Sequence, residues 1–294
     1  MTSLRTTAVG SYPRGRLSVA AAIRRAVADQ REAGLDLLTD GQVRADMLGL
    51  ILNRLPGVRR SLSASGTSYT VSPRLRPPDQ PLLLEDYRLA RSLAPPAPVK
   101  AVVTGPTTLA LACHPESGSP YDGQGFAPLA RDLAAIVTAE VAAFVGSGAE
   151  VVQMDEPSLR FSPDLALSLG LVAEALRGTP EPVLHVCGDV RGIYRHLLAC
   201  DVAQLSLEGT NPAGFPPIGR TDLVAAGMKV VLGCVSTHTT GLEPLAAVRD
   251  RLVAACDRFG ADLLWAAPDC GLRGHRRPQA RAKLRVLVTA ARSA

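Results

Sequence analysis

A chain of 294 residues, 47% of them hydrophobic, can bury a large core, so we expect one barrel-sized domain spanning residues 1–294. The net charge of +5 comes from arginines spread along the chain, and only 4% of residues are aromatic, which argues against a nucleic-acid partner. Neither a secretory signal nor a membrane-spanning apolar run is present, and six scattered cysteines resemble no disulfide framework. We therefore expect a cytoplasmic protein with reduced thiols and no membrane partner.

Short apolar runs alternate with amphipathic stretches from end to end, which is typical of βα units around a parallel sheet. The amphipathic stretches predict helices over residues 19–33, 129–145, 164–176 and 245–259. The apolar runs predict strands over residues 6–9, 35–39, 99–104, 150–154, 183–187, 202–207, 229–233 and 262–266. Eight strands with intervening helices in about this length predict an α/β fold, the (β/α)8 TIM barrel.

The length beyond a minimal barrel lies mostly in two long loops, near residues 56–84 and 113–127. The first contains the alternating stretch 67–71, which predicts a small hairpin, and the second contains the run 115–120, which is typical of an exposed loop. Both follow strand or helix ends, where a barrel can carry a lid. The densest basic run, residues 273–285, predicts a solvated helix face.

The predicted strand at 183–187 carries a metal-binding pattern. Alternation places His185 and Cys187 on the same face of the strand. An imidazole and a thiol so placed can both reach one cation, and zinc accepts this pair best. Taken alone, the pair is more typical of a core histidine beside a buried cysteine, so the interpretation depends on further ligands.

Barrel active sites lie at the C-terminal ends of the strands, so the residues that close each apolar run are informative. In strand order these residues are Ser11, Asp40, Gln42, Thr104, Asp155, Glu156, His185, Cys187, Glu208, Ser236, His238, Asp269 and Cys270. Glu208 and Cys270 close two different strands and could complete a zinc site with His185 and Cys187. The remaining cysteines have no such setting and are predicted to be core or surface thiols.

Six motifs in register resemble cobalamin-independent methionine synthase. They are TAVGSYP at 7–13, DGQVRADM at 40–47, QMDEP at 153–157, HVCG at 185–188, LGCV at 232–235 and PDCG at 268–271. The resemblance spans nearly the whole chain. It corresponds to the catalytic C-terminal barrel of the long enzymes and is most similar to the short single-barrel forms common in archaea. This barrel type is shared with uroporphyrinogen decarboxylase.

The resemblance implies a zinc-dependent methyltransferase that methylates a thiol, homocysteine above all, to give methionine. It implies Zn²⁺ held by His185, Cys187, Glu208 and Cys270. It further implies that substrate is bound by Ser11, Gln42, Asp155 and Glu156, and that Asp155 and His238 are catalytic, with His238 as proton donor. Long enzymes carry a glutamate where this chain has Gln42, which can accept a hydrogen bond from an ammonium but brings no charge.

The methyl donor is open between a methylcorrinoid, as methylcobalamin or on a corrinoid protein, and methyltetrahydrofolate. The chain lacks the N-terminal barrel that helps long enzymes hold the folate tail, which favours a corrinoid. His238 favours folate, because the departing nitrogen must be protonated.

Three alternatives remain. A related zinc-dependent alkyltransferase would act on another small thiol, such as a coenzyme M-like or natural-product thiol. A decarboxylase of the uroporphyrinogen type would need no zinc. A purely structural zinc site would have no acids or second histidine gathered beside it.

Overall fold

Short parallel strands form the main sheet. The computed structural model describes residues 4–63, 66–211 and 215–294. The strands are β1 (Arg5–Thr6), β4 (Ala101–Thr104), β6 (Val151–Asp155), β7 (Glu181–Val186), β8 (Gln204–Glu208), β9 (Lys229–Val235) and β10 (Leu264–Pro268). Neighbours follow the order β1-β10-β9-β8-β7-β6-β4, and every pair is parallel.

The predicted strand at 35–39 takes the eighth position only as a bridging segment. Leu37 pairs with Thr7 just after β1, and Leu38 pairs with Val99 just before β4. On the β1 side the ladder does not continue, because the side-chain amide of Gln30 donates to the carbonyl of Thr39 and accepts from its N–H, at 3.0 and 2.9 Å. The bridges close the ring, and the architecture is the predicted (β/α)8 TIM barrel.

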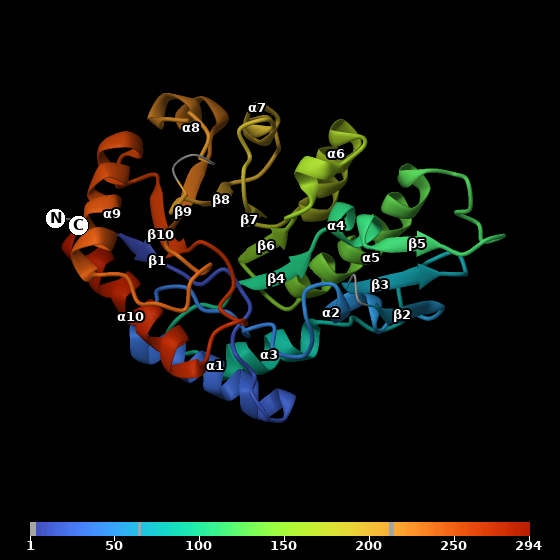
Figure 1. Cartoon of the computed structure of the whole chain (residues 1–294), viewed down its shortest axis with the longest axis horizontal. Coiled ribbons are helices and arrows are strands. Elements are labelled where there is room, and N and C mark those ends of the chain that lie inside the picture. Colours follow the sequence, from blue (N-terminus) through green and yellow to red (C-terminus); the bar gives the residue numbers. More distant parts are fainter. Residues whose placement is uncertain (1–3, 64–65, 212–214) are drawn as a thin grey trace.

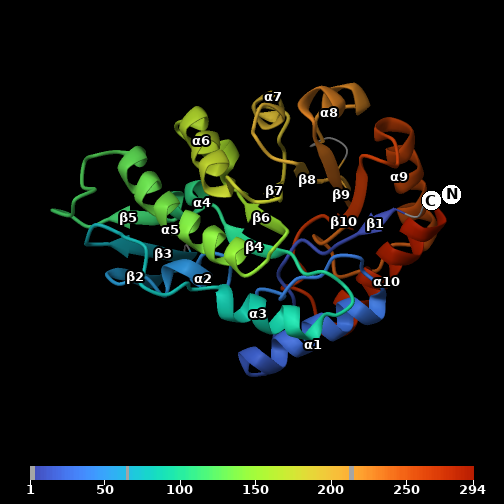
Figure 2. The same ribbon diagram turned by 180° about the vertical axis from the view of Figure 1, so that it is seen from behind.

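Helices surround the sheet in Figures 1 and 2. They are α1 (Val19–Ala33), α2 (Gly49–Leu52), α3 (Leu84–Leu93), α4 (Pro106–Leu111), α5 (Phe126–Gly146), the 3-10 turn η1 (Leu159–Phe161), α6 (Leu165–Leu176), α7 (Tyr194–Leu198), α8 (Arg220–Ala226), α9 (Leu245–Phe259) and α10 (Arg277–Ser293). The predicted helices at 19–33 and 245–259 are confirmed to the residue. The prediction at 164–176 differs by one residue, because the Asp164 side chain caps α6 by accepting from Leu167 N.

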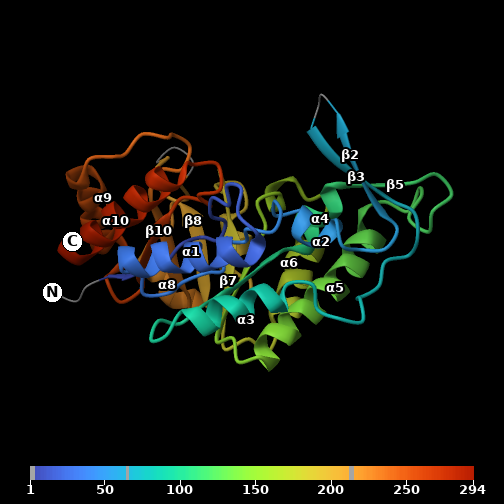
Figure 3. The same cartoon turned by 90° about the horizontal axis from the view of Figure 1, so that it is seen from below.

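The two long loops form one small sheet. Strand β2 (Val58–Ser63) pairs antiparallel with β3 (Gly66–Val71), which confirms the predicted hairpin, and β5 (Cys113–Pro115) pairs parallel with β3. Figure 3 shows the hairpin projecting from the body of the protein. The sequence did not predict the pairing with β5, which joins the two loops into a single structural feature.

The inside of the barrel changes from apolar to polar along β6. Val151 belongs to a buried apolar cluster with Leu37, Val183, Val231, Trp265 and Ala267. Because side chains alternate along a strand, Gln153 and Asp155 continue the same face toward the C-terminal end. That end therefore carries buried polar groups that need partners or a ligand. Among the described residues, no helix combines the length and apolar character needed to cross a bilayer.

Candidate active site

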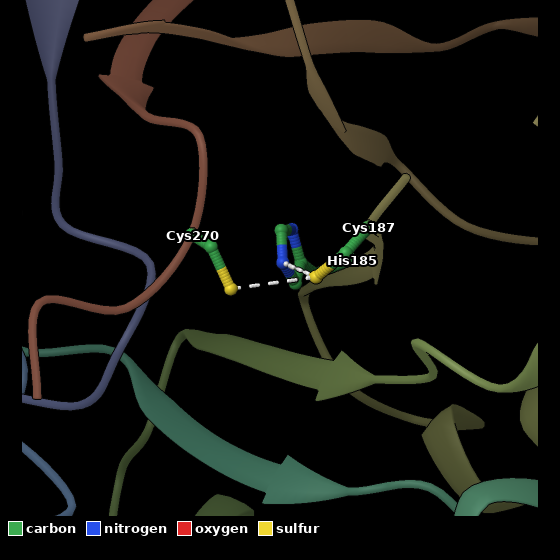
Figure 4. Close-up of side chains that lie close together, drawn as sticks. All are labelled: His185, Cys187 and Cys270. Carbon is green, nitrogen blue, oxygen red and sulfur yellow. Dashed lines mark hydrogen bonds between the residues drawn. The ribbon is translucent and has the colours of Figure 1, made fainter. Parts of the chain in front are cut away.

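Three predicted metal ligands meet at the C-terminal end of the barrel. His185 ends the inward face of β7, Cys187 follows that strand, and Cys270 follows β10. Nε2 of His185 lies 2.9 Å from Sγ of Cys187, which lies 3.5 Å from Sγ of Cys270. The three ligand atoms all lie within 4.8 Å of one another, and Figure 4 shows the side chains pointing toward a common space. One imidazole nitrogen and two sulfurs form a donor set that suits zinc.

The orientation of His185 is set by the neighbouring strand. His185 is paired in register with Ser206 of β8, and its Nδ1 lies 2.9 Å from the Ser206 hydroxyl. This contact directs Nε2 toward the cysteines. A hydrogen bond to the second ring nitrogen is the usual way in which proteins orient a metal-ligating histidine.

The two thiols are close enough to form a hydrogen bond. Sγ of Cys187 lies 3.5 Å from Sγ of Cys270, where either thiol can donate, and this contact lowers the pKa of the Cys270 thiol to about 4. The same contact raises the pKa of Cys187. A cysteine that loses its proton readily is suited to bind a cation, because the thiolate is the metal-binding form.

The fourth predicted ligand, Glu208, is not brought into this group. It closes β8, next to β7, but its Oε2 lies 3.3 Å from Nε2 of His238. The Glu208 side chain is 8% exposed whereas that of His238 is 59% exposed. Burial raises the pKa of Glu208. In this arrangement the acid and the histidine form a pair beside the site.

A cavity of about 240 Å³ opens beside the three ligands. Its lining includes His185, Cys187, Cys270, Ser11, Gln42, Asp155 and Arg273. Six of these seven residues belong to the predicted strand-end set, and the barrel brings them together from distant parts of the chain. His238, Glu208 and Glu156 are not among the lining residues.

Asp155 and Gln42 are buried polar groups on the cavity wall, each 5% exposed. Oδ1 of Asp155 accepts from Nε2 of Gln153 at 2.6 Å, and burial raises the pKa of Asp155 to about 6. Nε2 of Gln42 has no hydrogen-bond partner within the described part of the chain. A buried polar group without a partner is costly, so a polar ligand in the cavity would stabilise it.

Two glycines leave room for this wall. A Cβ on Gly10 would lie 2.6 Å from Oε1 of Gln42, and a Cβ on Gly271 would lie 2.0 Å from Oγ of Ser11. Either distance is too short for a real contact. Glycine at these two motif positions therefore lets the backbone approach the Gln42 and Ser11 side chains.

The predicted substrate residue Glu156 is used by a helix instead. It is fully buried, and its carboxylate accepts from the N–H of Thr107 and of Thr108 at 2.8 Å each, and from the Thr108 hydroxyl at 2.6 Å. These bonds satisfy the free N–H groups in the first turn of α4. Burial raises the pKa of Glu156 to about 7. The contacts point to a structural role, away from the cavity.

The sequence analysis missed Arg273. The basic run 273–285 was predicted to be a solvated helix face, but α10 begins only at Arg277, and Arg273 is a half-buried residue of the cavity wall. Burial lowers the pKa of its guanidinium. The one available signal was its position three residues after Cys270. Arg277 agrees better with the predicted solvated helix face. Its side chain is partly exposed, and its Nη2 lies 2.7 Å from Oδ1 of Asp29.

The chain is similar to known proteins along nearly its whole length. Residues 14–293 match the family model described as the catalytic domain of cobalamin-independent synthase. The chain is 33% identical to the methionine synthase of Methanothermobacter thermautotrophicus over 291 residues, covering 96% of this chain and 91% of that protein. It is 28% identical to the methionine synthase of Sulfolobus acidocaldarius over 304 residues, covering 93% and 87% of the two chains.

Solved structures share the fold. The B12-independent methionine synthase from Shewanella sp. W3-18-1, in complex with selenomethionine, matches with a TM-score of 0.85 and 22% identity over 99% of this chain and 97% of that one. A methyltransferase from Methanosarcina mazei matches with a TM-score of 0.73 and 18% identity over 99% and 94%. At such identities the likeness shows the barrel fold. The family model and the archaeal relatives show more than the fold, and they indicate that the protein is a methyltransferase. The chain belongs to the cobalamin-independent methionine synthase family.

Proposed function

We propose that this chain is a zinc-dependent methyltransferase that transfers a methyl group to the thiol of homocysteine, giving methionine. The observation that carries the proposal is the meeting of His185, Cys187 and Cys270 beside a cavity whose wall includes the buried polar groups Gln42 and Asp155. These three residues would hold the ion, and Glu208 is the proposed fourth ligand. Zinc bound there would supply the Lewis acidity that lets a thiol lose its proton at neutral pH.

The chain's own residues would bind and orient the acceptor. A buried carboxylate attracts an ammonium strongly, so Asp155 is the proposed partner of the homocysteine amine. Gln42 would offer its unpartnered amide, and Ser11 its hydroxyl, to the rest of the amino-acid group. Holding the acceptor in this way aligns its sulfur with the methyl carrier and lowers the entropic part of the barrier.

His238 is the proposed proton donor to the departing carrier. It is exposed at the edge of the site and contacts Glu208, a carboxylate that can hold the imidazole in one orientation. The proposed donors are a methylcorrinoid and methyltetrahydrofolate, and only the folate needs a proton when it leaves.

A single catalytic domain over residues 1–294 and a cytoplasmic location stay predictions.

Purified, zinc-loaded protein tests the proposal directly. It is incubated with homocysteine and either methylcobalamin or methyltetrahydrofolate, and methionine is measured. A Cys256→Ser variant is the matched control, because Cys256 lies on α9 outside the cavity. Methionine formed by the parent and the control, but not by Cys270→Ser, supports the proposal. If a coenzyme M-like thiol is methylated in place of homocysteine, the acceptor is wrong. If no thiol is methylated with either donor, the proposed reaction itself is wrong.

A further inference from the structure

A buried lysine lies beneath the proposed acceptor site. Lys100 directly precedes β4 and is 3% exposed. Its ammonium contacts Oε1 of Gln153, a fully buried residue of β6. A buried lysine is costly unless it is paired, so a specific role is expected. Neither the metal ligands nor the cavity lining include Lys100.

The hydrogen bonds of Gln153 leave its amide one orientation. Its Nε2 donates to the carbonyl of Val9 at 2.9 Å and to Oδ1 of Asp155 at 2.6 Å. A carbonyl and a carboxylate only accept, so the NH₂ group must face them, and both of its hydrogens are used. The Oε1 atom then faces the ammonium of Lys100, which can only donate. Lysine can donate in either protonation state, so the contact does not depend on its charge.

The reverse orientation of the amide would be unfavourable. If the Gln153 amide turned over, its oxygen would face the Val9 carbonyl and the Asp155 carboxylate, and its NH₂ would face Lys100. Three groups that now have a partner would then lack one. Without Lys100, however, the present orientation leaves Oε1 unsatisfied, so the preference for it is weaker.

We infer that Lys100 is a positioning residue: it holds the amide of Gln153, which in turn holds the carboxylate of Asp155 toward the ammonium of the acceptor. The inference rests on the proposed function, because it needs an acceptor that carries an amine. Lys100 then serves acceptor binding without touching the acceptor. Its removal affects the affinity for the acceptor more than the transfer step or the metal.

Two variants test the inference. Lys100→Met removes the donor to Oε1 and keeps a side chain of similar length. Gln153→Glu keeps an acceptor for Lys100 but removes the NH₂ group that Asp155 and Val9 require. Both variants are expected to raise the homocysteine Kd and KM about tenfold, equivalent to about 1.4 kcal/mol, with kcat within about twofold of the parent and unchanged zinc content.

Two controls separate this role from general damage to the fold. Glu140→Gln removes a buried carboxylate that accepts from Leu82 N and Leu83 N ahead of α3, so it lowers the thermal midpoint while the acceptor KM stays unchanged. The des-amino analogue of homocysteine has no ammonium for Asp155. The parent and Lys100→Met are therefore expected to bind this analogue equally well, a result that a merely structural lysine would not produce.

Each outcome decides the inference. An unchanged homocysteine Kd in Lys100→Met overturns it. So does a tolerated Gln153→Glu, because Lys100 would then act without the amide. If Lys100→Met does not fold, Gln153→Glu decides alone, since it retains the lysine contact. Failure of the parent protein to bind homocysteine contradicts the proposed function instead, and is recognised before any variant is compared.

Discussion

Replacing Asp155 with asparagine removes a negative charge from the cavity wall with little change of shape. The amide oxygen of the new side chain can still accept from Nε2 of Gln153, so the surrounding contacts are kept. Asp155 is only 5% exposed, so solvent does little to weaken its contact with a bound ammonium. A hydrogen bond to a charged group contributes about 1.5–3 kcal/mol. We therefore expect the homocysteine KM to rise roughly 10- to 150-fold in Asp155→Asn.

The assay compares KM, kcat and bound zinc in the parent and the variant, above neutral pH. Asp155 is not among the three clustered ligands, so zinc content is expected to stay at the parent value. A homocysteine KM equal to that of the parent would refute the reasoning. Asp155 would then have another role, or the acceptor would lack an amine.

The adjacent carboxylate gives a contrasting expectation. Glu156→Gln places an NH₂ group against N–H donors at the start of α4, which leaves a buried group unsatisfied at a cost of about 1–3 kcal/mol. We expect a lower free energy of unfolding in denaturant, with an unchanged acceptor KM. A raised KM at unchanged stability would restore the predicted substrate role of Glu156.

Three further predictions concern the zinc content, the methyl donor and the stability of the fold at acidic pH. The parent is expected to carry about one zinc per chain, lost in Cys187→Ser and Cys270→Ser because thiolates supply most of the affinity; full metal retention in both variants would exclude the site. His238→Asn is expected to lower the rate roughly 100-fold with methyltetrahydrofolate and hardly at all with methylcobalamin; equal losses with both donors would contradict its role as acid. Although burial opposes it, the hydrogen bond from Arg277 lowers the pKa of Asp29 below its ordinary value. This ion pair therefore stabilises the fold above the unfolded-state pKa, and its contribution is lost as the pH falls through the lower folded-state pKa. Thermal midpoints measured on acidification should fall less in Asp29→Asn than in the parent, and identical curves would argue against the pair.

Local features of the sequence determined the regular elements. Helix α1 begins after Ser18, whose hydroxyl accepts from Ala21 N, and ends at Gly34, whose φ of 87° is easy for glycine. Such signals act within a few residues and can be read without knowing the fold. The same holds for His185 and Cys187, because the alternation of a strand alone places them on one side.

The tertiary structure decided which distant groups meet. Glu208 and Glu156 both close predicted strands, yet one pairs with His238 and the other with the first turn of α4. The choice depends on where those partners lie in space, which strand patterns do not encode. The segment predicted as a strand at 35–39 forms only two bridges, and on its β1 side the Gln30 side chain occupies the backbone groups of Thr39.

Arg273 and Lys100 show the limit most clearly. In the sequence, the first belongs to a basic run and the second is an isolated cation before an apolar strand. Barrel closure places Arg273 in the cavity wall and Lys100 beneath Gln153. Sequence alone determined the helices at 19–33 and 245–259 and the placing of His185 and Cys187 on one side of the chain at the end of β7, because these follow from local geometry. Only the closed barrel decided the partners of Glu156, Glu208 and Lys100, because each of these partners comes from a different strand or loop.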